Sequence, residues 1–392
     1  MVRKQFSSIF KIIPAWFSRS AKPEPTEELV NAPPGVLNSL GERLVKLSVP
    51  QPYETTIQDA LAQALQDWQA NPDFENNSLV VLGRPVEDIG PILKASLHEK
   101  FPDCEVHFFL GGYQRPPDPL TVPQHLKREL EPNTDTPSDI ATPVTQTDID
   151  KHVPTIMVVS SLEQCFLRCI QGWEGIEYLQ TLSTQDSSRF WIFGCNHWTW
   201  SFLERVCQIS AYFEQAIALP KLSGPELKVW LMPLLETNLE TQATGPMVKV
   251  TAANDSYWNT LASVTDGIAS TAAQVWLKSL RIRADAVTDE GAIANKTDLI
   301  ELIPTKPVLP GLMSLDPLDR YLLHSLLIHR EMTRSHLALS LGEAERNIRS
   351  RLQVLRREGI IRQRGRRFSV HPAYYPRLYS ELGNNNFLIG NA

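Results

Sequence analysis

The chain has 392 residues, of which 42% are hydrophobic and 21% are charged. That length allows two or three domains with cores of their own, and no segment approaches the roughly 20 consecutive apolar residues of a membrane-spanning helix. The five cysteines are scattered and odd in number, which does not indicate a disulfide framework and is typical of a reducing compartment. We therefore expect a cytoplasmic protein.

The formal net charge of −6 conceals a strong asymmetry along the chain. Residues 1–22 carry five basic residues and no acidic one, and residues 320–377 carry thirteen arginines, no lysine and four glutamates. The two segments are therefore near +5 and +9, and residues 23–319 carry about −19. This division of charge indicates an anionic partner for the two basic segments.

The first 22 residues have apolar side chains at helical spacing, with basic and small polar residues on the other side. This pattern predicts a basic amphipathic helix that binds an anionic membrane surface or a protein partner. Alternatively, the segment packs on its own protein or stays unstructured. The contact residues would be Phe6, Phe10, Ile13, Trp16 and Phe17. Residues 23–53 are rich in proline and predict a linker with one short helix around Leu37 to Leu47.

A helix is expected from Glu54 to Gln69, followed by a strand at Leu79–Gly83, a loop and a helix at Pro91–Lys100. Strand, glycine-bearing loop and helix are the layout of a nucleotide-binding P-loop. The working motif closes with Gly-Lys-Ser/Thr, and these places fall here on Asp88-Ile89-Gly90, or on Gly90-Pro91-Ile92 if the loop is shifted by two residues. Neither register supplies the lysine, and the acidic residues at 87 and 88 would repel a triphosphate.

Three more strands are expected downstream, at Val106–Leu110, Thr155–Val159 and Arg189–Asn196. In P-loop NTPases the strand that corresponds to Thr155–Val159 ends in the acidic residues that hold Mg²⁺. Here Ser160 and Ser161 follow that strand instead. Alternating strands and helices predict a parallel α/β sheet with helices on both faces. Residues 113–151 contain seven prolines and predict a mobile insertion that contributes no core, with at most one helical turn at residues 124–130.

The order of these motifs resembles a degenerate AAA+ or STAND-like P-loop NTPase domain, over roughly residues 54–285. In this resemblance Asn196 stands at the sensor 1 position, and Trp258–Leu280 corresponds to the lid, whose turn at Asp266–Ser270 lacks the sensor 2 arginine. The resemblance implies a P-loop NTPase-like α/β domain at residues 54–224 and a helical lid at residues 225–285. It also implies a degenerate nucleotide site, made of Gly83, Arg84, Gly90, Lys94, Ser160 and Asn196.

We expect no catalytic residue, no metal and no required cofactor in this site, because the lysine, both acids and the sensor 2 arginine are missing. One alternative is a switch that binds ATP without hydrolysing it. Such a switch would use the loop amides between Gly83 and Gly90, together with a basic group such as Arg84 or Lys94.

After a second linker at residues 286–313, residues 314–380 resemble a winged helix-turn-helix. Three helices are expected, at Ser314–Ile328, Thr333–Leu341 and Glu343–Glu358, followed by two strands around the loop at residues 364–367. The apolar positions of the third helix should face the core; they are Ala344, Ile348, Leu352 and Leu355. Its other face would enter the major groove of DNA, where arginine reads guanine and asparagine reads adenine. The candidates for reading bases are Arg346, Asn347, Arg349, Gln353 and Arg356 on this helix. The candidates for contacting the DNA backbone are Arg364, Arg366 and Arg367 of the loop.

These observations favour a non-catalytic regulatory or scaffold protein in which a pseudo-ATPase domain is coupled to a DNA-binding winged helix. A protein-interaction adaptor, peripheral at a membrane, is the alternative in which the winged helix docks a protein partner. In a third interpretation the arginines contact the protein's own acidic body, or the α/β domain forms a homo-oligomer. His336, in the second helix of the C-terminal module, is expected on the surface.

Overall fold

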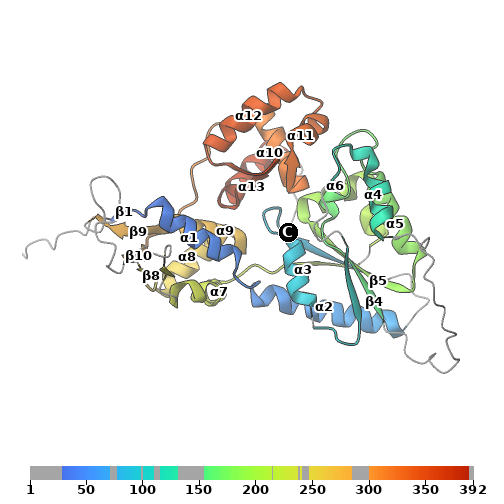
Figure 1. Ribbon diagram of the computed structural model, residues 1–392, viewed down its shortest axis with the longest axis horizontal. Helices are drawn as coiled ribbons and strands as arrows, with labels where there is room; N and C mark the ends of the chain where they lie inside the picture. Colours follow the sequence, from blue (N-terminus) through green and yellow to red (C-terminus); the bar gives the residue numbers. More distant parts are fainter. Residues whose placement is uncertain are drawn as a thin grey trace, which may run out of the picture.

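The computed structural model describes three connected parts (Figure 1): a parallel α/β domain, a lid of helices and a small sheet, and a C-terminal module. The described residues are 29–70, 77–98, 100–109, 115–130, 154–213, 215–236, 239–240, 247–284 and 300–387. The predicted membrane or partner residues of the first segment, Phe6 to Phe17, lie outside this part of the chain.

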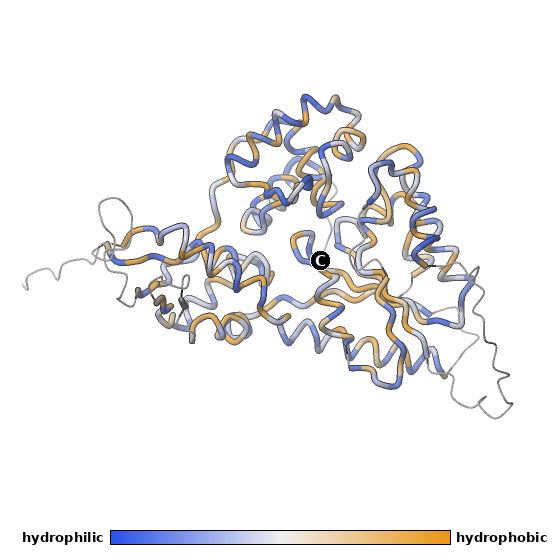
Figure 2. The backbone as a smooth tube through the Cα atoms, in the orientation of Figure 1, coloured by the Kyte–Doolittle hydropathy of each residue, from blue (hydrophilic) through white to orange (hydrophobic). Residues whose placement is uncertain are grey.

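The α/β domain is built on a sheet of five strands in the order β3-β4-β5-β2-β6, all pairs of which are parallel. The strands are β2 (Ser78–Gly83), β3 (Glu105–Phe109), β4 (Thr155–Val159), β5 (Arg189–Asn196) and β6 (Ala216–Ala218). Every residue of β2 is buried, and the central strands are hydrophobic along their length (Figure 2), because a parallel sheet is covered on both faces. Gly83 pairs with Asn196, so the P-loop-like loop and the predicted sensor position lie at one edge.

Helices cover both faces of this sheet, and alternate residues of β2 contact opposite layers. Leu79 and Val81 belong to the core formed with α2 (Gln51–Ala70) and α3 (Ile89–Leu97). Val80 and Leu82 belong to a second core on the other face. That core includes residues of α4 (Val122–Leu130), α5 (Glu174–Gln185) and α6 (His197–Cys207). The predicted parallel α/β sheet with helices on both faces is therefore confirmed.

Part of the region predicted as an insertion without a core is instead folded. Residues 115–130 include the turn η1 (Pro119–Thr121) and α4, in which Val122, Leu126 and Leu130 are buried. Two of the prolines stand at the starts of these short helices, where a missing N–H costs nothing;. The prediction that residues 115–130 contribute no core was wrong. It relied on the high proline content and overlooked the helical spacing of the apolar residues Val122, Leu126 and Leu130. Residues 131–151 of the predicted insertion lie outside the described part.

The lid contains the predicted helices α7 (Gly224–Glu236), α8 (Asp255–Thr265) and α9 (Ala269–Ser279). They are joined by a sheet that was not expected and by a further helix, α1 (Pro34–Val45), which corresponds to the short helix predicted around Leu37 to Leu47. The strands of the sheet are β1 (Leu29–Asn31), β7 (Leu239–Glu240), β8 (Met247–Val250), β9 (Leu280–Arg283) and β10 (Ile300–Pro304), in the sheet order β1-β9-β10-β8-β7. Parts of both predicted linkers therefore belong to the lid, because strands of two to five residues carry too little pattern to be recognised.

The C-terminal module has the predicted three helices and hairpin, which is the element order of a winged helix. Its elements are α10 (Pro317–His329), β11 (Glu331–Thr333), α11 (Arg334–Leu341), α12 (Glu345–Arg357), β12 (Ile361–Arg364), β13 (Arg367–Val370) and, unexpectedly, α13 (Tyr375–Asn384). Ile348, Leu352 and Leu355 are buried as predicted, whereas Ala344 is exposed because it is the N-cap of α12. None of the helices in the described ranges is long and apolar enough to cross a membrane.

The C-terminal module shares its core with the α/β domain. One continuous cluster joins Val80 and Trp198 of the α/β domain to Leu322, Leu327 and Leu378 of the module. Polar contacts cross the same boundary: the indole Nε1 of Trp198 donates to the hydroxyl of Tyr375 at 3.0 Å. Because the module would expose part of this core if removed, we expect the two parts to fold as one unit.

We predict that Tyr375→Phe destabilises the whole protein by about 1–3 kcal/mol, because it leaves the indole N–H of buried Trp198 without an acceptor;. The matched control is Tyr379→Phe, since the ring of Tyr379 also contacts Trp198 and its hydroxyl forms no hydrogen bond with another described residue. Urea unfolding of the full chain, followed by fluorescence and circular dichroism, should give one coincident transition in all three proteins. Separate transitions for the module and the α/β domain would contradict the shared core.

Candidate functional site

The loop between β2 and α3 comprises residues 84–88 and contains its own anion. The Glu87 carboxylate is buried, accepts the Arg84 backbone N–H at 3.1 Å and accepts the hydroxyl of Tyr53 at 2.6 Å. A working P-loop directs its backbone N–H groups at bound phosphates. Here the Glu87 carboxylate accepts a hydrogen bond from one of these backbone N–H groups, that of Arg84. Burial raises the pKa of this carboxyl group, while the Tyr53 hydrogen bond lowers it.

An isoleucine stands at the place of the P-loop lysine and packs into the core. Ile89 is 1% exposed, and its side chain fills the space beside Gly83 and Gly194. A Cβ atom on Gly83 would lie 2.0 Å from its Cδ1, and one on Gly194 would lie 2.8 Å from its Cγ2. Gly90 follows in place of the Mg²⁺-binding hydroxyl, and Lys94 lies one turn further on, exposed on α3.

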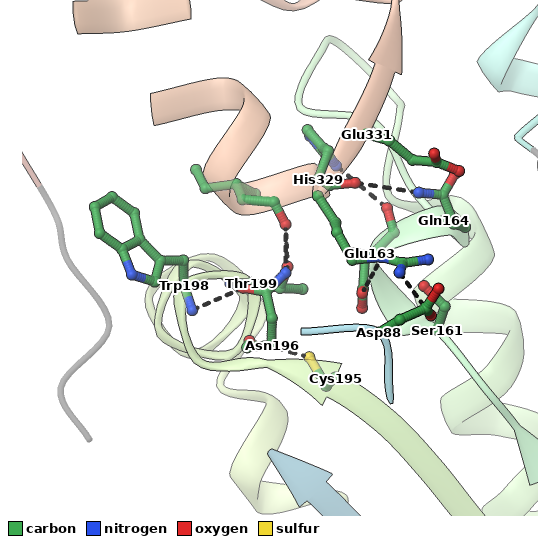
Figure 3. Close-up of polar contacts among 12 residues, drawn as sticks. Asp88, Ser161, Glu163, Gln164, Cys195, Asn196, Trp198, Thr199, His329 and Glu331 are labelled. Atoms are coloured by element: carbon green, nitrogen blue, oxygen red, sulfur yellow. Dashed lines mark hydrogen bonds and ion pairs between the residues drawn. The ribbon is translucent and has the colours of Figure 1, made fainter. Parts of the chain in front are cut away.

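A cation from the C-terminal module occupies the edge of the sheet instead. The Arg330 guanidinium lies 2.6 Å (Nη1) from Oδ1 of Asp88 and 3.5 Å (Nε) from Oε1 of Glu163. Glu163 is 1% exposed; burial raises the pKa of its carboxyl group, and the Arg330 charge lowers it. Figure 3 shows Asp88, Ser161 and Glu163 together beside the segment of His329.

The backbone at Arg330 is strained, since its φ of +59° is in a region that non-glycine residues rarely adopt;. Such a conformation costs on the order of 1–3 kcal/mol and persists where surrounding contacts fix it. The two ion pairs and the buried His329 beside it provide those contacts.

Asn196, the predicted sensor residue, lies at the end of β5 but has no hydrogen-bonding capacity left. Its Oδ1 accepts the backbone N–H groups of Trp198 and Thr199 at 2.9 and 3.0 Å. Its Nδ2 donates to Oγ1 of Thr199 at 2.9 Å and to the carbonyl of Ile328 at 3.0 Å. A primary amide offers two donors and two acceptor sites, so this side chain caps α6 and binds the module (Figure 3).

His329, which precedes Arg330 in the chain, is also buried between the module and the α/β domain. His329 is fully buried; its Nε2 accepts the Arg168 backbone N–H at 3.2 Å, and its carbonyl accepts a hydrogen bond from Gln164 at 3.1 Å. Burial, and then the charge of Arg115, lower the pKa of this histidine well below its usual range. His336, expected on the surface, is buried with its Nε2 2.9 Å from the carbonyl of Pro116.

The site residues at this edge do not fit a magnesium nucleotide. In the first of the two registers, buried Ile89 stands where the motif has its lysine. The carboxylates of Asp88 and Glu163 are paired with Arg330, and buried Ser160 follows β4 where the motif has its metal-binding acids. Over the described ranges, no three His, Cys, Asp or Glu side chains form a group that could hold a metal ion. The structure brings Gly83 and Asn196 together at this edge. The sequence prediction did not include Arg115, His329 and Arg330, whose contacts depend on docking of the module.

A second candidate site is the solvent face of α12, at the outer edge of the module (Figure 1). All five residues predicted for DNA reading are exposed: Arg346, Asn347, Arg349, Gln353 and Arg356. Two of them are oriented by neighbours, since Asn347 donates to Glu343 at 3.0 Å and Arg356 donates to Gln363 at 2.6 Å. Arg346, Arg349, Gln353 and Arg356 share one helical face, while Ile348 and Leu352 hold another face in the core. Asn347 projects from a different side of the helix, because side chains two residues apart do not share a face.

The hairpin arginines lie apart from that face. Arg364 and Arg366 are exposed, and Arg367 forms an ion pair with Glu331. Together with Arg362 they line a groove of about 1300 Å³ between the module, the lid and the loop at residues 84–88. Gln353 and Arg356, by contrast, line a separate small groove of about 140 Å³ on the module itself. The structure therefore separates the predicted DNA-binding residues into two sets.

His371 follows the hairpin and is close to several cations. Its Nδ1 accepts the Ala373 backbone N–H at 3.2 Å. Burial, then the charges of Arg362 and Lys278, lower its pKa to about 3. The charges of Arg362 and Lys278 therefore add to burial in disfavouring the protonated form of His371;.

Comparisons with known proteins gave matches among solved structures only, since no family model and no curated protein matches the chain. The chain is similar to Cdc6p from Pyrobaculum aerophilum, with 15% identity over 85% of this chain and 94% of that one and a TM-score of 0.35. It is also similar to the ORC2 protein of Aeropyrum pernix, with 12% identity, 84% and 92% coverage and a TM-score of 0.37. The RuvB Holliday junction branch migration motor of Thermotoga maritima gives 15% identity, 82% and 94% coverage and a TM-score of 0.33. All of these TM-scores are below 0.5, and no function follows from them.

We predict that Arg330→Met lowers the free energy of unfolding by about 3 kcal/mol, because it leaves the buried Glu163 carboxylate without a cation;. Adding Glu163→Gln to this variant should recover much of the loss, since it removes the unpaired charge. Arg205→Met, at an exposed position of α6, serves as the control. Urea unfolding measures all four proteins, and equal stability of Arg330→Met and the control would contradict the role of Arg330.

A pH dependence follows from His371, whose pKa of about 3 lies below its ordinary 6.5. The unfolded chain takes up this proton first, so the stability that neutral His371 provides is lost as the pH falls from 6.5 towards 3. His371→Asn keeps an acceptor for the Ala373 N–H and removes the titration. Between pH 7 and pH 5 the variant should lose less stability than the wild type, by at most about 1 kcal/mol per pH unit. Identical losses in urea unfolding at the two pH values would contradict this assignment.

Proposed function

We propose that the protein is a non-catalytic regulatory scaffold that binds DNA through the exposed face of α12. The observation that carries the proposal is this face, where Arg346, Arg349 and Arg356 are exposed beside Gln353; Asn347 is exposed at the start of the same helix. Arginine can contact guanine O6 and N7 with two hydrogen bonds, and asparagine or glutamine can contact adenine in the same way. A helix of this width fits the major groove of B-DNA.

The packing of α12 supports a rigid reading surface. Arg351, on the other side of the helix, donates a hydrogen bond to the buried Asp319. Its guanidinium also lies 2.9 Å from the Asp316 carboxylate, and these two contacts link α12 to the start of α10. The core residues Ile348 and Leu355 hold the same side. Side chains on a fixed helix lose less conformational entropy on binding than side chains on a mobile segment.

The state of the sheet edge supports a role without ATP hydrolysis. Arg330 neutralises Asp88, Asn196 is fully hydrogen-bonded, and Ile89 fills the place of the lysine. The α/β domain then acts as a support that fixes the module, and no nucleotide is required for that task. A protein-interaction adaptor and an ATP-binding switch are the competing functions.

We predict that the full-length protein binds a labelled random-sequence DNA duplex at physiological salt, measured by fluorescence anisotropy. Arg349→Ala/Arg356→Ala should weaken this binding roughly tenfold or more and reduce the slope of log K against log salt, since each lost phosphate or base contact removes part of the affinity. The full chain is the appropriate sample, because the module shares its core with the α/β domain.

The control is Arg205→Ala/Arg377→Ala, which removes the same charge from two exposed positions outside α12. Equal weakening in both double variants would mean that only net charge matters and would overturn the proposed face. Absence of binding at physiological salt would make the adaptor the better hypothesis. A thermal shift with ATP that Arg84→Ala abolishes would instead support the nucleotide switch.

A further inference from the structure

The groove between the module and the lid has opposite walls with different chemistry. The module contributes Arg362, Arg364 and Arg366. The lid contributes Ser270 and Gln274 from the first turns of α9, together with apolar residues of the segment after α1. With a volume of about 1300 Å³, the groove is larger than most small-molecule pockets.

The three carboxylates that line this groove already have partners. Glu87 accepts from Tyr53 and from the Arg84 backbone, Asp88 binds Arg330, and Glu331 binds Arg367. No ion pair within the described residues involves Arg362, Arg364 or Arg366. The groove therefore keeps an excess of positive charge on its module side.

Arg362 is the unusual member of this set. It is half-buried, and its Nε has no hydrogen-bond partner in the described chain. Burial and then the charge of Arg364 lower its pKa to about 10. A half-buried guanidinium beside another cation is destabilising unless an anion compensates it.

The lid wall offers donors to such an anion. The helix α9 has 11 residues, begins at Ala269 and has no side-chain cap at Ile268. The Ala269 N–H is already used by the Tyr53 hydroxyl at 3.4 Å, but the Ser270 hydroxyl is buried and has no partner in the described chain. Arg362 and Ser270 thus line the same groove, one from the module and one from the lid, although the Arg362 Nε and Ser270 Oγ atoms themselves are buried.

We propose that this groove is a phosphate-binding site, in which Arg362 and Arg364 hold phosphate oxygens from one wall and Ser270 and Gln274 from the other. Guanidinium groups suit this ligand because their planar array of N–H donors matches two phosphate oxygens. The phosphates come either from a free polyphosphate or from the backbone of a nucleic acid strand. This inference goes beyond the proposed function and does not depend on it, since α12 contributes no residue to the groove.

The experiment is a titration of the full-length protein with sodium tripolyphosphate, by calorimetry and thermal shift, against sodium chloride of equal ionic strength. We expect saturable binding that Arg362→Gln weakens about tenfold or more, since it removes the central charge-assisted contact. Without ligand, Arg362→Gln should be as stable as the wild type or more stable, because it removes an uncompensated charge. Ser270→Ala should weaken binding by a smaller factor.

Two further arms distinguish the source of the phosphate and separate this site from α12. Oligothymidylate of about twelve nucleotides replaces tripolyphosphate in one arm. Binding of the oligonucleotide alone, with loss in Arg362→Gln, would assign the site to a nucleic acid backbone. In the other arm Arg349→Ala/Arg356→Ala should bind tripolyphosphate as the wild type does, even where it no longer binds duplex DNA. If neither probe binds at millimolar concentration, or if Arg362→Gln binds both as tightly as the wild type, the proposal is overturned.

Discussion

The position of the C-terminal module depends on one buried arrangement, in which Arg330 lies between Asp88 and Glu163. The Glu163 carboxylate is almost inaccessible to water, and a buried carboxylate without a cation is strongly unfavourable. The partner comes from a residue far along the chain, so the α/β domain satisfies its own edge only when the module is docked. The strained backbone at Arg330 and the hydrogen bonds to Ile328 and His329 follow from the same contact.

This constraint determines which arginines face solvent. With the end of α10 fixed on the sheet edge, α12 lies on the outside of the molecule (Figure 1) and the hairpin lines the groove towards the lid. The sequence places these arginines within about twenty residues of one another, and an undocked module could present all of them to one ligand. Docking divides them into an outer set on α12 and an inner set around Arg362.

Short sequence patterns predicted the helices and strands whose residues interact mainly with their neighbours in the chain. The bounds of β4 and β5 follow from continuous apolar runs, and the three module helices follow from their caps and spacing. The carboxyl edge of the sheet was identified correctly, and Asn196 does lie there. Its role as a helix cap and docking residue was not predictable, because it depends on the carbonyl of Ile328, which is remote in the sequence. The lid sheet was missed for a similar reason: β1 is stabilised by β9, about 250 residues away, and three residues alone carry no strand signal.

The packing of Ile89 also sets a limit on protein engineering. Installing a P-loop lysine at this position would place an ammonium group between Gly83 and Gly194, in a space that an aliphatic side chain fills. The same lysine would have to leave the core, and the glycines would then face an empty volume. A designer would therefore need to rebuild the loop, free Asp88 and Glu163 from Arg330 and restore the acids after β4 together. The packing of Ile89 thus links the identity of this one side chain to the two glycines of the neighbouring strands, so a substitution at any of the three positions disturbs the other two.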